Sequence, residues 1–347
     1  MEKLKTAIVG YGGMGGSHAR RLSQIDKFDL VGVYDIDPER EKIARENGLR
    51  VFSSPEEIVS SGIEAVVVAV PNDVHAHYVK FFAGAGVGVL CEKPVMMTSK
   101  ELEEVSKAVS GKGVFAVNQN RRFDNDYLTA KKIIESDVLK GVYRIESRVV
   151  GGNGIPGGWR KELKHGGGMM LDWGVHLIDQ ILLLSDSKIK SVYCTYSYAT
   201  GYEVEDAFNL ELSFDNGLEA NIVVETNTFI PMPRWRLYGY GGTAEITKWD
   251  LTGEIVKPKP LDASAITGMD AGNGFTKTMA YKPSSETDIL PLPAITPNPD
   301  GIYDNFYNAV KNGEKTLVTV EQAVRVMKVM ETAALSARKG EVIKGSF

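Results

Sequence analysis

The chain has 347 residues, enough for one large domain or two ordinary ones, and its hydrophobic fraction of 43% suits a globular protein with a sizeable core. A net charge of −5 without any basic run gives no reason to expect nucleic-acid binding. No apolar run approaches the roughly 20 residues that span a bilayer, the N-terminus does not resemble a signal peptide, and the two cysteines have no metal-binding spacing, so we expect a cytoplasmic protein without membrane association.

Six short apolar runs in the first third of the chain predict parallel strands that are buried on both faces. The runs are Thr6–Val9, Leu30–Tyr34, Leu49–Phe52, Ala65–Val70, Gly88–Cys91 and Val114–Val117. They are nearly continuous in apolar residues instead of alternating, and helical segments separate them. Repeated strand-then-helix units imply a parallel sheet with right-handed crossovers. Residues 1–122 are therefore predicted to form a doubly wound α/β domain of the Rossmann type.

The turn after the first of these strands has the pattern of a dinucleotide-binding loop. It consists of Gly10, Tyr11, Gly12, Gly13, Met14 and Gly15, a match to G-x-G-x-x-G. The pattern alone is weak, but here it follows a strand and opens a helix, which is the context that the chemistry needs. Gly10 permits the tight turn, Gly12 lets the backbone approach a pyrophosphate, and Gly15 lets the helix pack closely against the strand. The helix N-terminus then presents free N–H groups to the phosphates.

An acidic residue strengthens the prediction of a dinucleotide site. Asp35 ends the second strand about 20 residues after Gly15, the distance at which a carboxylate binds the ribose hydroxyls. That carboxylate would repel a 2′-phosphate, and Arg40 nearby only partly offsets the repulsion. The sequence therefore favours NAD and disfavours NADP. A surface aspartate beside an α/β turn that binds no nucleotide is the alternative interpretation.

Polar residues also follow the fourth and fifth predicted strands, at the edge where a doubly wound sheet places its ligand crevice. Pro71, Asn72 and His75 follow the fourth strand, and Glu92 and Lys93 follow the fifth. A proline comes directly after Lys93 and biases its backbone toward an extended shape, so its side chain can project into the crevice. A surface salt bridge for Lys93 and a local helix-start hydrogen bond for His75 are the alternatives.

The second part of the chain, residues 123–347, is predicted to be an α+β domain built on an open, mostly antiparallel sheet. Its sequence predicts a helix over Tyr127–Ser136 and a strand over Val142–Val149. Residues 208–224 alternate between apolar and polar on both sides of Asp-Asn-Gly, which predicts a hairpin. Leu251–Asp300 is rich in Pro, Gly, Thr and Asp, and it is expected either to cross over a pocket or to form a mobile loop.

A glycine-rich stretch precedes a predicted helix over Met169–Leu184. On an α-helix Asp172 and His176 are four residues apart and share one face, and Asp179 lies one turn further. An apolar stripe beside that face can pack against the sheet. The polar face suits either the lining of a cleft or a salt-bridged helix surface, and a purely structural role is open for Asp179 in particular.

Taken together, these features occur in the order seen in the glucose-fructose oxidoreductase, inositol dehydrogenase and rhizopine catabolism (Gfo/Idh/MocA) family. The chain resembles the family over nearly its whole length, with the weakest likeness in Leu251–Asp300. The residues that carry the resemblance are the glycine turn, Asp35, Pro71-Asn72, Glu92-Lys93-Pro94, Asn120-Arg121-Arg122-Phe123, Trp159-Arg160 and Asp172 with His176 and Asp179. The resemblance implies that Lys93, Asp172 and His176 form the catalytic group beside the nicotinamide. In this family the lysine–proline bond is often cis, which can apply here.

The residue types fit the oxidation of a secondary alcohol by a nicotinamide cofactor, which is held and oriented by the protein. His176 is the natural general base because its unperturbed pKa of about 6.5 lies near working pH. Lys93 can stabilise the developing alkoxide, and Asp172 can bind the hydroxyl or orient its neighbours. No metal is required, and the five histidines form no evident zinc pattern.

The resemblance also implies a polyol, sugar, sugar derivative or cyclitol as substrate. Asn120, Arg122, Trp159 and Arg160 are the candidates, besides Asp172 and His176, to line the substrate pocket or the nicotinamide end of the cofactor. A core position for Trp159 is the alternative to stacking on a sugar, and an arginine in the pocket can indicate an acidic substrate. The exposed sheet face of the second domain is expected to form a homodimer or homotetramer.

Two other classes of function remain open from the sequence. One is a glycoside hydrolase that keeps NAD bound and oxidises its sugar transiently. The other is a dinucleotide-binding regulator without catalysis, which is disfavoured because a regulator has no need of Lys93, Asp172 and His176. A dehydrogenase acting on CH–OH groups is the leading prediction.

Overall fold

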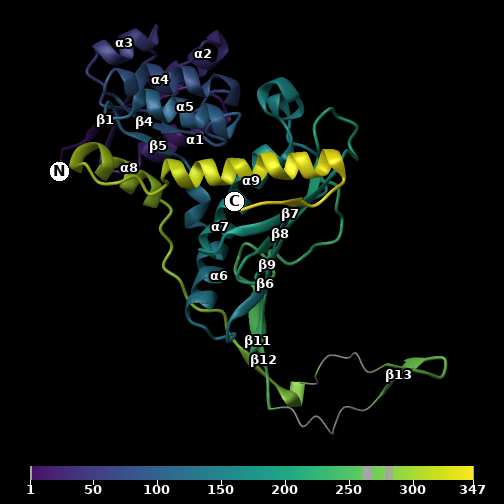
Figure 1. Ribbon diagram of the computed structural model, residues 1–347. Helices are drawn as coiled ribbons and strands as arrows, with labels where there is room; N and C mark the ends of the chain where they lie inside the picture. The colour runs from purple at the N-terminus through teal and green to yellow at the C-terminus, as the bar shows by residue number, and fades with distance from the viewer. Residues whose placement is uncertain (1, 261–267, 278–281, 283, 347) are drawn as a thin grey trace.

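The computed structural model describes residues 2–260, 268–277, 282 and 284–346 and places two sheets in two parts of the chain (Figure 1). The first sheet has five parallel strands in the order β2-β1-β3-β4-β5. Its strands are β1 (Leu4–Val9), β2 (Phe28–Tyr34), β3 (Ala65–Val68), β4 (Gly88–Cys91) and β5 (Phe115–Val117), and its helices are α1 (Gly13–Leu22), α2 (Pro38–Glu46), α3 (Pro55–Ser60), α4 (His75–Gly84) and α5 (Ser99–Val109). The predicted doubly wound α/β fold is confirmed.

One predicted strand of this sheet is wrong. Leu49–Phe52 forms no strand, and only Val51 makes an isolated parallel bridge, to Val33. The segment contacts the edge strand β2 through two backbone hydrogen bonds to Val33 and then turns into α3 at Ser54, whose side chain caps that helix. The run pairs with β2 at Val33 alone and forms no ladder, although Phe52 is fully buried in the core.

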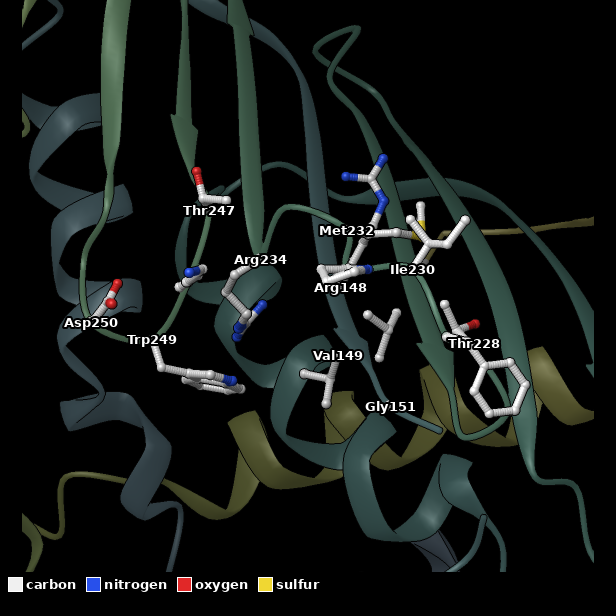
Figure 2. Close-up of a pocket in the computed structure, with 14 residues that line it drawn as sticks. Arg148, Val149, Gly151, Thr228, Ile230, Met232, Arg234, Thr247, Trp249 and Asp250 are labelled. Carbon is white, nitrogen blue, oxygen red and sulfur yellow. The ribbon is translucent and has the colours of Figure 1, made fainter. Parts of the chain in front are cut away.

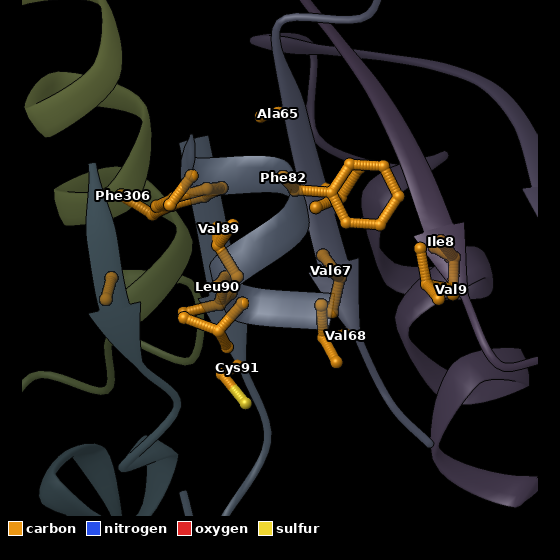
Figure 3. Close-up of a cluster of buried hydrophobic side chains, with 14 of the residues drawn as sticks. Ile8, Val9, Ala65, Val67, Val68, Phe82, Val89, Leu90, Cys91 and Phe306 are labelled. Carbon is orange, nitrogen blue, oxygen red and sulfur yellow. The ribbon is translucent and has the colours of Figure 1, made fainter. Parts of the chain in front are cut away.

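The core of the first sheet is completed by a helix from the far end of the sequence. Strands β3 and β4 bury every side chain, as the nearly continuous apolar runs predict. Figure 3 shows Phe306 of α8 (Gly301–Asn312) beside Val89 and Leu90 of β4. Gly88 permits this approach, because a Cβ there would lie 2.7 Å from Cγ2 of Val310. The buried face of α8 thus belongs to the first core. The domain boundary between residues 122 and 123 stays a prediction.

The second sheet has nine strands in the order β15-β12-β11-β10-β6-β9-β8-β7-β16. They are β6 (Val142–Val150), β7 (Ile189–Ser197), β8 (Ala207–Phe214), β9 (Glu219–Glu225), β10 (Trp235–Gly239), β11 (Gly242–Ile246), β12 (Gly253–Pro258), β15 (Thr287–Leu290) and β16 (Ile343–Lys344). Only the neighbours β6 and β9 are parallel, so the sheet is mostly antiparallel, as predicted. The hairpin predicted over residues 208–224 is β8 and β9.

Helices cover one face of the second sheet. They are α6 (Asn125–Glu135), α7 (Val175–Leu183) and α9 (Val320–Lys339), which contact β10, β9 and β7 respectively. The helix predicted over Tyr127–Ser136 is α6. Figure 1 shows no long helix among the described residues on the opposite face of the sheet. The second hydrophobic core lies between these helices and the sheet.

The Pro- and Gly-rich stretch Leu251–Asp300 contributes two strands to the second sheet. β12 and β15 pair with each other and extend the second sheet at one edge. A small hairpin of β13 (Met269–Gly272) and β14 (Phe275–Lys277) projects from this end of the molecule (Figure 1). The remaining residues, 261–267, 278–281 and 283, lie outside the described part of the chain. No helix within the described residues is long and apolar enough to cross a membrane.

Candidate active site

A cavity of about 670 Å³ lies at the carboxyl ends of the parallel strands, where the fold predicts a ligand crevice. Its size falls within the usual range for a small-molecule site. Twelve of the predicted site residues line it, namely Gly10, Gly12, Gly13, Met14, Asp35, Arg40, Pro71, Asn72, Glu92, Lys93, Trp159 and Arg160. The structure thus brings together segments that are widely separated in the sequence.

The glycine turn leaves room for a pyrophosphate in front of α1. Gly10 has φ of +91°, and a Cβ at this position would lie 2.6 Å from the carbonyl oxygen of Ala69. A Cβ on Gly15 would lie 1.9 Å from the carbonyl oxygen of Gly10, so helix and strand pack without space for a side chain. At Gly12 and Gly13 a Cβ would meet no described atom within 4 Å, because both face the open cavity. The turn fits a dinucleotide.

Asp35 is held in place at the mouth of the same cavity. Its carboxylate accepts hydrogen bonds from the backbone N–H groups of Tyr11, at 2.6 Å, and Asp37, at 2.9 Å. Two amide donors fix the carboxylate while leaving it further lone pairs for ribose hydroxyls. Tyr11 contributes through this N–H, since its side chain is buried. The Nε atom of Arg40 lies 4.0 Å from Oδ2 of the neighbouring Asp37.

Lys93 meets Asp172 between the two domains. Nζ of Lys93 lies 2.8 Å from Oδ1 of Asp172 and 2.8 Å from its backbone carbonyl oxygen. Nε of Arg160 lies 3.1 Å from the other carboxylate oxygen, Oδ2. Burial alone would raise the pKa of Asp172, but the charges and hydrogen bonds of Lys93 and Arg160 hold it below the usual value. Asp172 is therefore a carboxylate that holds the ammonium group of Lys93. The peptide bond between Lys93 and Pro94 is cis.

His176 is buried and fixed in one tautomer by Gln119. Nε2 of Gln119 donates to the carbonyl oxygen of Val175, so its Oε1 is the atom that faces Nδ1 of His176, at 3.1 Å. An amide oxygen only accepts, hence Nδ1 carries the proton and Nε2 keeps the lone pair. Burial, together with the positive charges of Lys93 and Arg121, holds the pKa of His176 well below its usual value. The imidazole is neutral and can take a proton at Nε2.

The helix that carries Asp172 and His176 is not the single α-helix predicted over Met169–Leu184. It opens with a π-helical turn, Met170–Gly174, and continues as α7. Glu205 accepts a hydrogen bond from the N–H of Met170 at 2.9 Å and so satisfies the start of this turn. A π-turn is wider than an α-turn and occurs often at functional sites. Asp172 bonds Lys93 and Arg160, whereas His176 bonds Gln119, so the two do not act as a mutual pair.

Three predicted site residues are placed elsewhere. Arg122 is buried, and its Nε and Nη2 lie 2.8 and 2.7 Å from the carboxylate oxygens of Asp179. This is the structural alternative that the sequence left open for Asp179. Both ring nitrogens of His75 lie 3.0 Å from backbone carbonyl oxygens, those of Pro94 and Val70, inside the first domain. The side chain of Asn120 is exposed.

Sequence reasoning missed several residues of the site. The cavity of about 670 Å³ is also lined by Tyr34, Ile36, Asp37, His77 and Tyr78. Tyr34 and Asp37 flank Asp35 and could have been found from the strand end, whereas His77 and Tyr78 lie on α4 without any motif. Gln119, the residue before the Asn-Arg-Arg-Phe run, had no signal because an amide that orients a histidine has no characteristic spacing. In the part of the chain that the structure describes, no group of three His, Cys, Asp or Glu residues is arranged to hold a metal ion.

A second cavity, of about 460 Å³, opens at the carboxyl end of β6 (Figure 2). It is bounded by the end of β6 at Val149, the segment Thr228–Met232 after β9, and Trp249 between β11 and β12. The ring of Trp249 is half exposed and its centroid lies 6.2 Å from that of Trp173. The Trp173 ring in turn lies 6.2 Å from the ring of His176. Two tryptophans thus connect the second cavity to the helix that carries His176.

Two family profiles match the chain. Residues 4–119 match the oxidoreductase family with an NAD-binding Rossmann fold, and residues 127–245 match the GFO/IDH/MocA C-terminal domain. A solved NAD-binding protein from Listeria innocua shares 41% identity, covers 99% of this chain and 100% of its own, and superposes with a TM-score of 0.94.

The curated relatives with named activities include two scyllo-inositol dehydrogenases. The NADP-dependent scyllo-inositol 2-dehydrogenase of Bacillus subtilis is 26% identical over 99% of this chain and 96% of its own length. The NAD-dependent scyllo-inositol 2-dehydrogenase of the same organism is 30% identical over 55% of this chain and 56% of its own length. The two relatives act on the same cyclitol with different cofactors.

Proposed function

The chain belongs to the Gfo/Idh/MocA family of oxidoreductases, and on that premise we propose that it is an NAD-dependent dehydrogenase that interconverts a secondary hydroxyl and a ketone on a sugar, sugar derivative or cyclitol. The observation that carries the proposal is the tautomer of His176. With Nδ1–H donated to Gln119, Nε2 is the free base in a buried site that also holds the ammonium group of Lys93. That is the pair of groups that alcohol oxidation needs.

The roles of the three residues follow from their contacts. Nε2 of His176 takes the proton of the substrate hydroxyl, and its low pKa keeps it unprotonated before the reaction. The ammonium group of Lys93 stabilises the oxygen as negative charge develops on it. Asp172 keeps that ammonium group in place and is itself held by Arg160. In the reverse direction the same groups return the proton to the oxygen.

NAD is the cofactor that the site supports best. The bound nicotinamide would supply the hydride acceptor, and the chain's own residues would bind and orient the dinucleotide. Asp35 carries its negative charge at the ribose position, where a 2′-phosphate would meet repulsion. Because one relative is NADP-dependent, the preference of this chain for NAD over NADP is to be measured directly.

For the substrate, the second cavity supports the ring of a sugar or cyclitol. Trp249 lines that cavity and is half exposed, next to Trp173, with the guanidinium group of Arg234 over its ring at 4.9 Å. Trp159, the platform expected from the sequence, instead lines the dinucleotide cavity, where the guanidinium group of Arg160 lies over its ring at 4.7 Å. Arg160 is engaged by Asp172, so it gives no support to an acidic substrate.

A panel assay tests the proposal. Purified protein is incubated with NAD or NADP and with inositols, aldoses, sugar acids and aryl glycosides, and the absorbance of reduced nicotinamide is followed. We expect NAD reduction with one polyol or sugar class, lost in His176→Ala and Lys93→Ala. Glycoside cleavage without net reduced nicotinamide would show an NAD-retaining hydrolase instead. Tight NAD binding without turnover of any compound would favour a regulator.

The remaining parts of the proposal concern assembly and location. The face of the second sheet that no described long helix covers is expected to pair with a second copy, giving a homodimer or homotetramer (Figure 1). A clean monomer in size-exclusion chromatography with light scattering would contradict this. Both cysteines, Cys91 and Cys194, are buried free thiols, which is compatible with a reducing cytoplasm. Fractionation of cells that express the tagged protein checks the location.

A further inference from the structure

A buried chain of hydrogen bonds runs from α8 to the residue beside Lys93. Oη of Tyr303 lies 2.8 Å from Nδ1 of His18, and Nε2 of His18 lies 2.8 Å from Oε1 of Glu92. Their exposed fractions are only 8%, 2% and 5%. Tyr303 lies on α8, His18 on α1 and Glu92 directly after β4, so the chain links three elements of the first core. The proposed proton transfer uses none of these groups.

Both carboxylate oxygens of Glu92 have protein partners. Oε1 also accepts from Nδ2 of Asn118 at 2.6 Å, and Oε2 accepts from the backbone N–H of Lys93 at 3.1 Å. Glu92 therefore holds the main chain of the catalytic lysine itself. Although Glu92 borders the dinucleotide cavity, its carboxylate is satisfied from the protein side, which favours a role in positioning over the cofactor contact expected from the sequence.

The proton positions along this chain follow from its acceptor end. Burial would raise the pKa of Glu92, but His18, Lys93 and Asn118 together bring it to about 2, so the carboxylate is ionised and accepts. His18 must then donate from Nε2. Burial, with the charge of Glu92, raises the pKa of Tyr303, so its hydroxyl keeps its proton and is the partner of Nδ1, the other ring nitrogen of His18. Tyr303 thus holds the ring of His18 in the orientation in which its Nε2 faces Glu92.

We propose that Tyr303, His18 and Glu92 are positioning residues for Lys93. They fix the main chain that follows β4, so that the ammonium group of Lys93 meets Asp172. The inference rests on the function proposed above. Without the tyrosine hydroxyl, His18 loses the partner of its Nδ1, and the ring that holds the carboxylate of Glu92 is itself held less firmly. The main chain at Lys93 would then be held less firmly. A small displacement of a catalytic group is enough to slow the chemical step.

The first test is Tyr303→Phe with Tyr307→Phe as a matched control. Both rings pack edge-on against Phe28, with centroids 6.3 and 6.1 Å away, so each variant removes only a hydroxyl. The hydroxyl of Tyr307 donates to the backbone carbonyl of Glu2, outside the chain to Lys93. We expect Tyr303→Phe to lower kcat about tenfold, with KM and NAD affinity within about twofold, and Tyr307→Phe to keep the original kcat. An unchanged kcat in Tyr303→Phe, or equal losses in both variants, would overturn the proposal.

The second test needs no turnover. The acylation rate of Lys93 by an N-hydroxysuccinimide ester is measured by peptide mass spectrometry against Lys311, whose side chain is equally buried (14% and 13% exposed) and held by Glu64. In Tyr303→Phe we expect the ratio of the Lys93 rate to the Lys311 rate to rise about fivefold, the change that the net free energy of one hydrogen bond produces. An unchanged ratio would contradict the positioning role. A protein that oxidises no sugar would refute the proposed function, and this ratio would still decide the inference.

Discussion

The ammonium group of Lys93 lies 2.8 Å from Oδ1 of Asp172, which is 79 positions further along the chain. Lys93 follows the end of β4 in the first sheet, and Asp172 lies on the π-turn that opens α7 in the second domain. The ion pair therefore joins the cavity at the glycine turn to the helix that carries the proposed base. Arg160 holds the second oxygen of the same carboxylate, so the pair has a defined geometry.

Replacing Lys93 is expected to change the pH dependence of the reaction as well as its rate. The pKa of His176 is lowered by burial and by the charges of Lys93 and Arg121, so Lys93→Met should let it rise toward its ordinary value. The base is then protonated at a higher pH, and the acid limb of the kcat/KM profile should move upward, with kcat/KM lower by about 10²-fold or more. Lys93→Arg keeps the charge and should leave the limb in place. Identical limbs in both variants would contradict the assignment.

Cofactor choice is expected to depend on the charge of Asp35. Asp35→Asn keeps the shape of the side chain but removes the charge that binds ribose and repels a 2′-phosphate. Hydrogen bonds to charged groups contribute about 1.5–3 kcal/mol, so kcat/KM for NAD should fall by about tenfold or more while that for NADP rises. The ratio of the two values in wild type and variant measures the effect. A ratio that does not move would mean that Asp35 does not contact the ribose.

The second cavity is expected to bind the ring of the substrate through Trp249. Trp249→Ala should raise KM for the sugar by roughly tenfold, since aromatic stacking contributes about 0.5–1.5 kcal/mol beyond the buried area. Trp249→Phe should retain part of the affinity, and the dissociation constant of NAD, measured by fluorescence, should stay the same in both variants. If Trp249→Ala weakened the binding of NAD and the binding of the sugar equally, the residue would support the fold and would not contact the substrate.

Arg122 and Asp179 are expected to matter for stability. Their paired charges are buried, so Asp179→Asn leaves a guanidinium without its counter-charge and should lower the free energy of unfolding by about 3–5 kcal/mol. Urea denaturation followed by circular dichroism measures this loss. The exposed pair of Lys100 and Glu104 is the control, and Lys100→Met should leave the unfolding midpoint unchanged. A stable Asp179→Asn protein with lower sugar affinity would return Arg122 to the substrate pocket.

Much of the fold could be predicted because its signals are local. The glycine turn and the hairpin over residues 208–224 each depend on neighbours in the sequence. The strand predicted over Leu49–Phe52 failed because an apolar run does not show whether a ladder partner is available along its length. The π-turn at Met170–Gly174 was missed because it has the same periodic pattern as the α-helix that follows it.

The parts of the site that escaped prediction depend on long-range contacts. Tyr303 reaches His18 across 285 positions, and Gln119 reaches His176 across 57. Trp249, between β11 and β12, meets Trp173 of the π-turn although the two lie far apart in the sequence. Arg122 was assigned to the pocket because the Asn-Arg-Arg-Phe run is part of the family resemblance. Its partner Asp179 could be identified only in three dimensions.

Transfer of deuterium from a labelled substrate to the nicotinamide tests the central claim most directly. The protein is incubated with NAD and with inositols and sugars that carry deuterium on the carbinol carbons, and the nicotinamide is examined by mass spectrometry. A dehydrogenase should accumulate reduced nicotinamide with one deuterium in the wild type and none in His176→Ala. If a labelled glycoside is added and releases its sugar while the nicotinamide stays oxidised, the account is contradicted, because the cofactor would then return the hydride that it accepts.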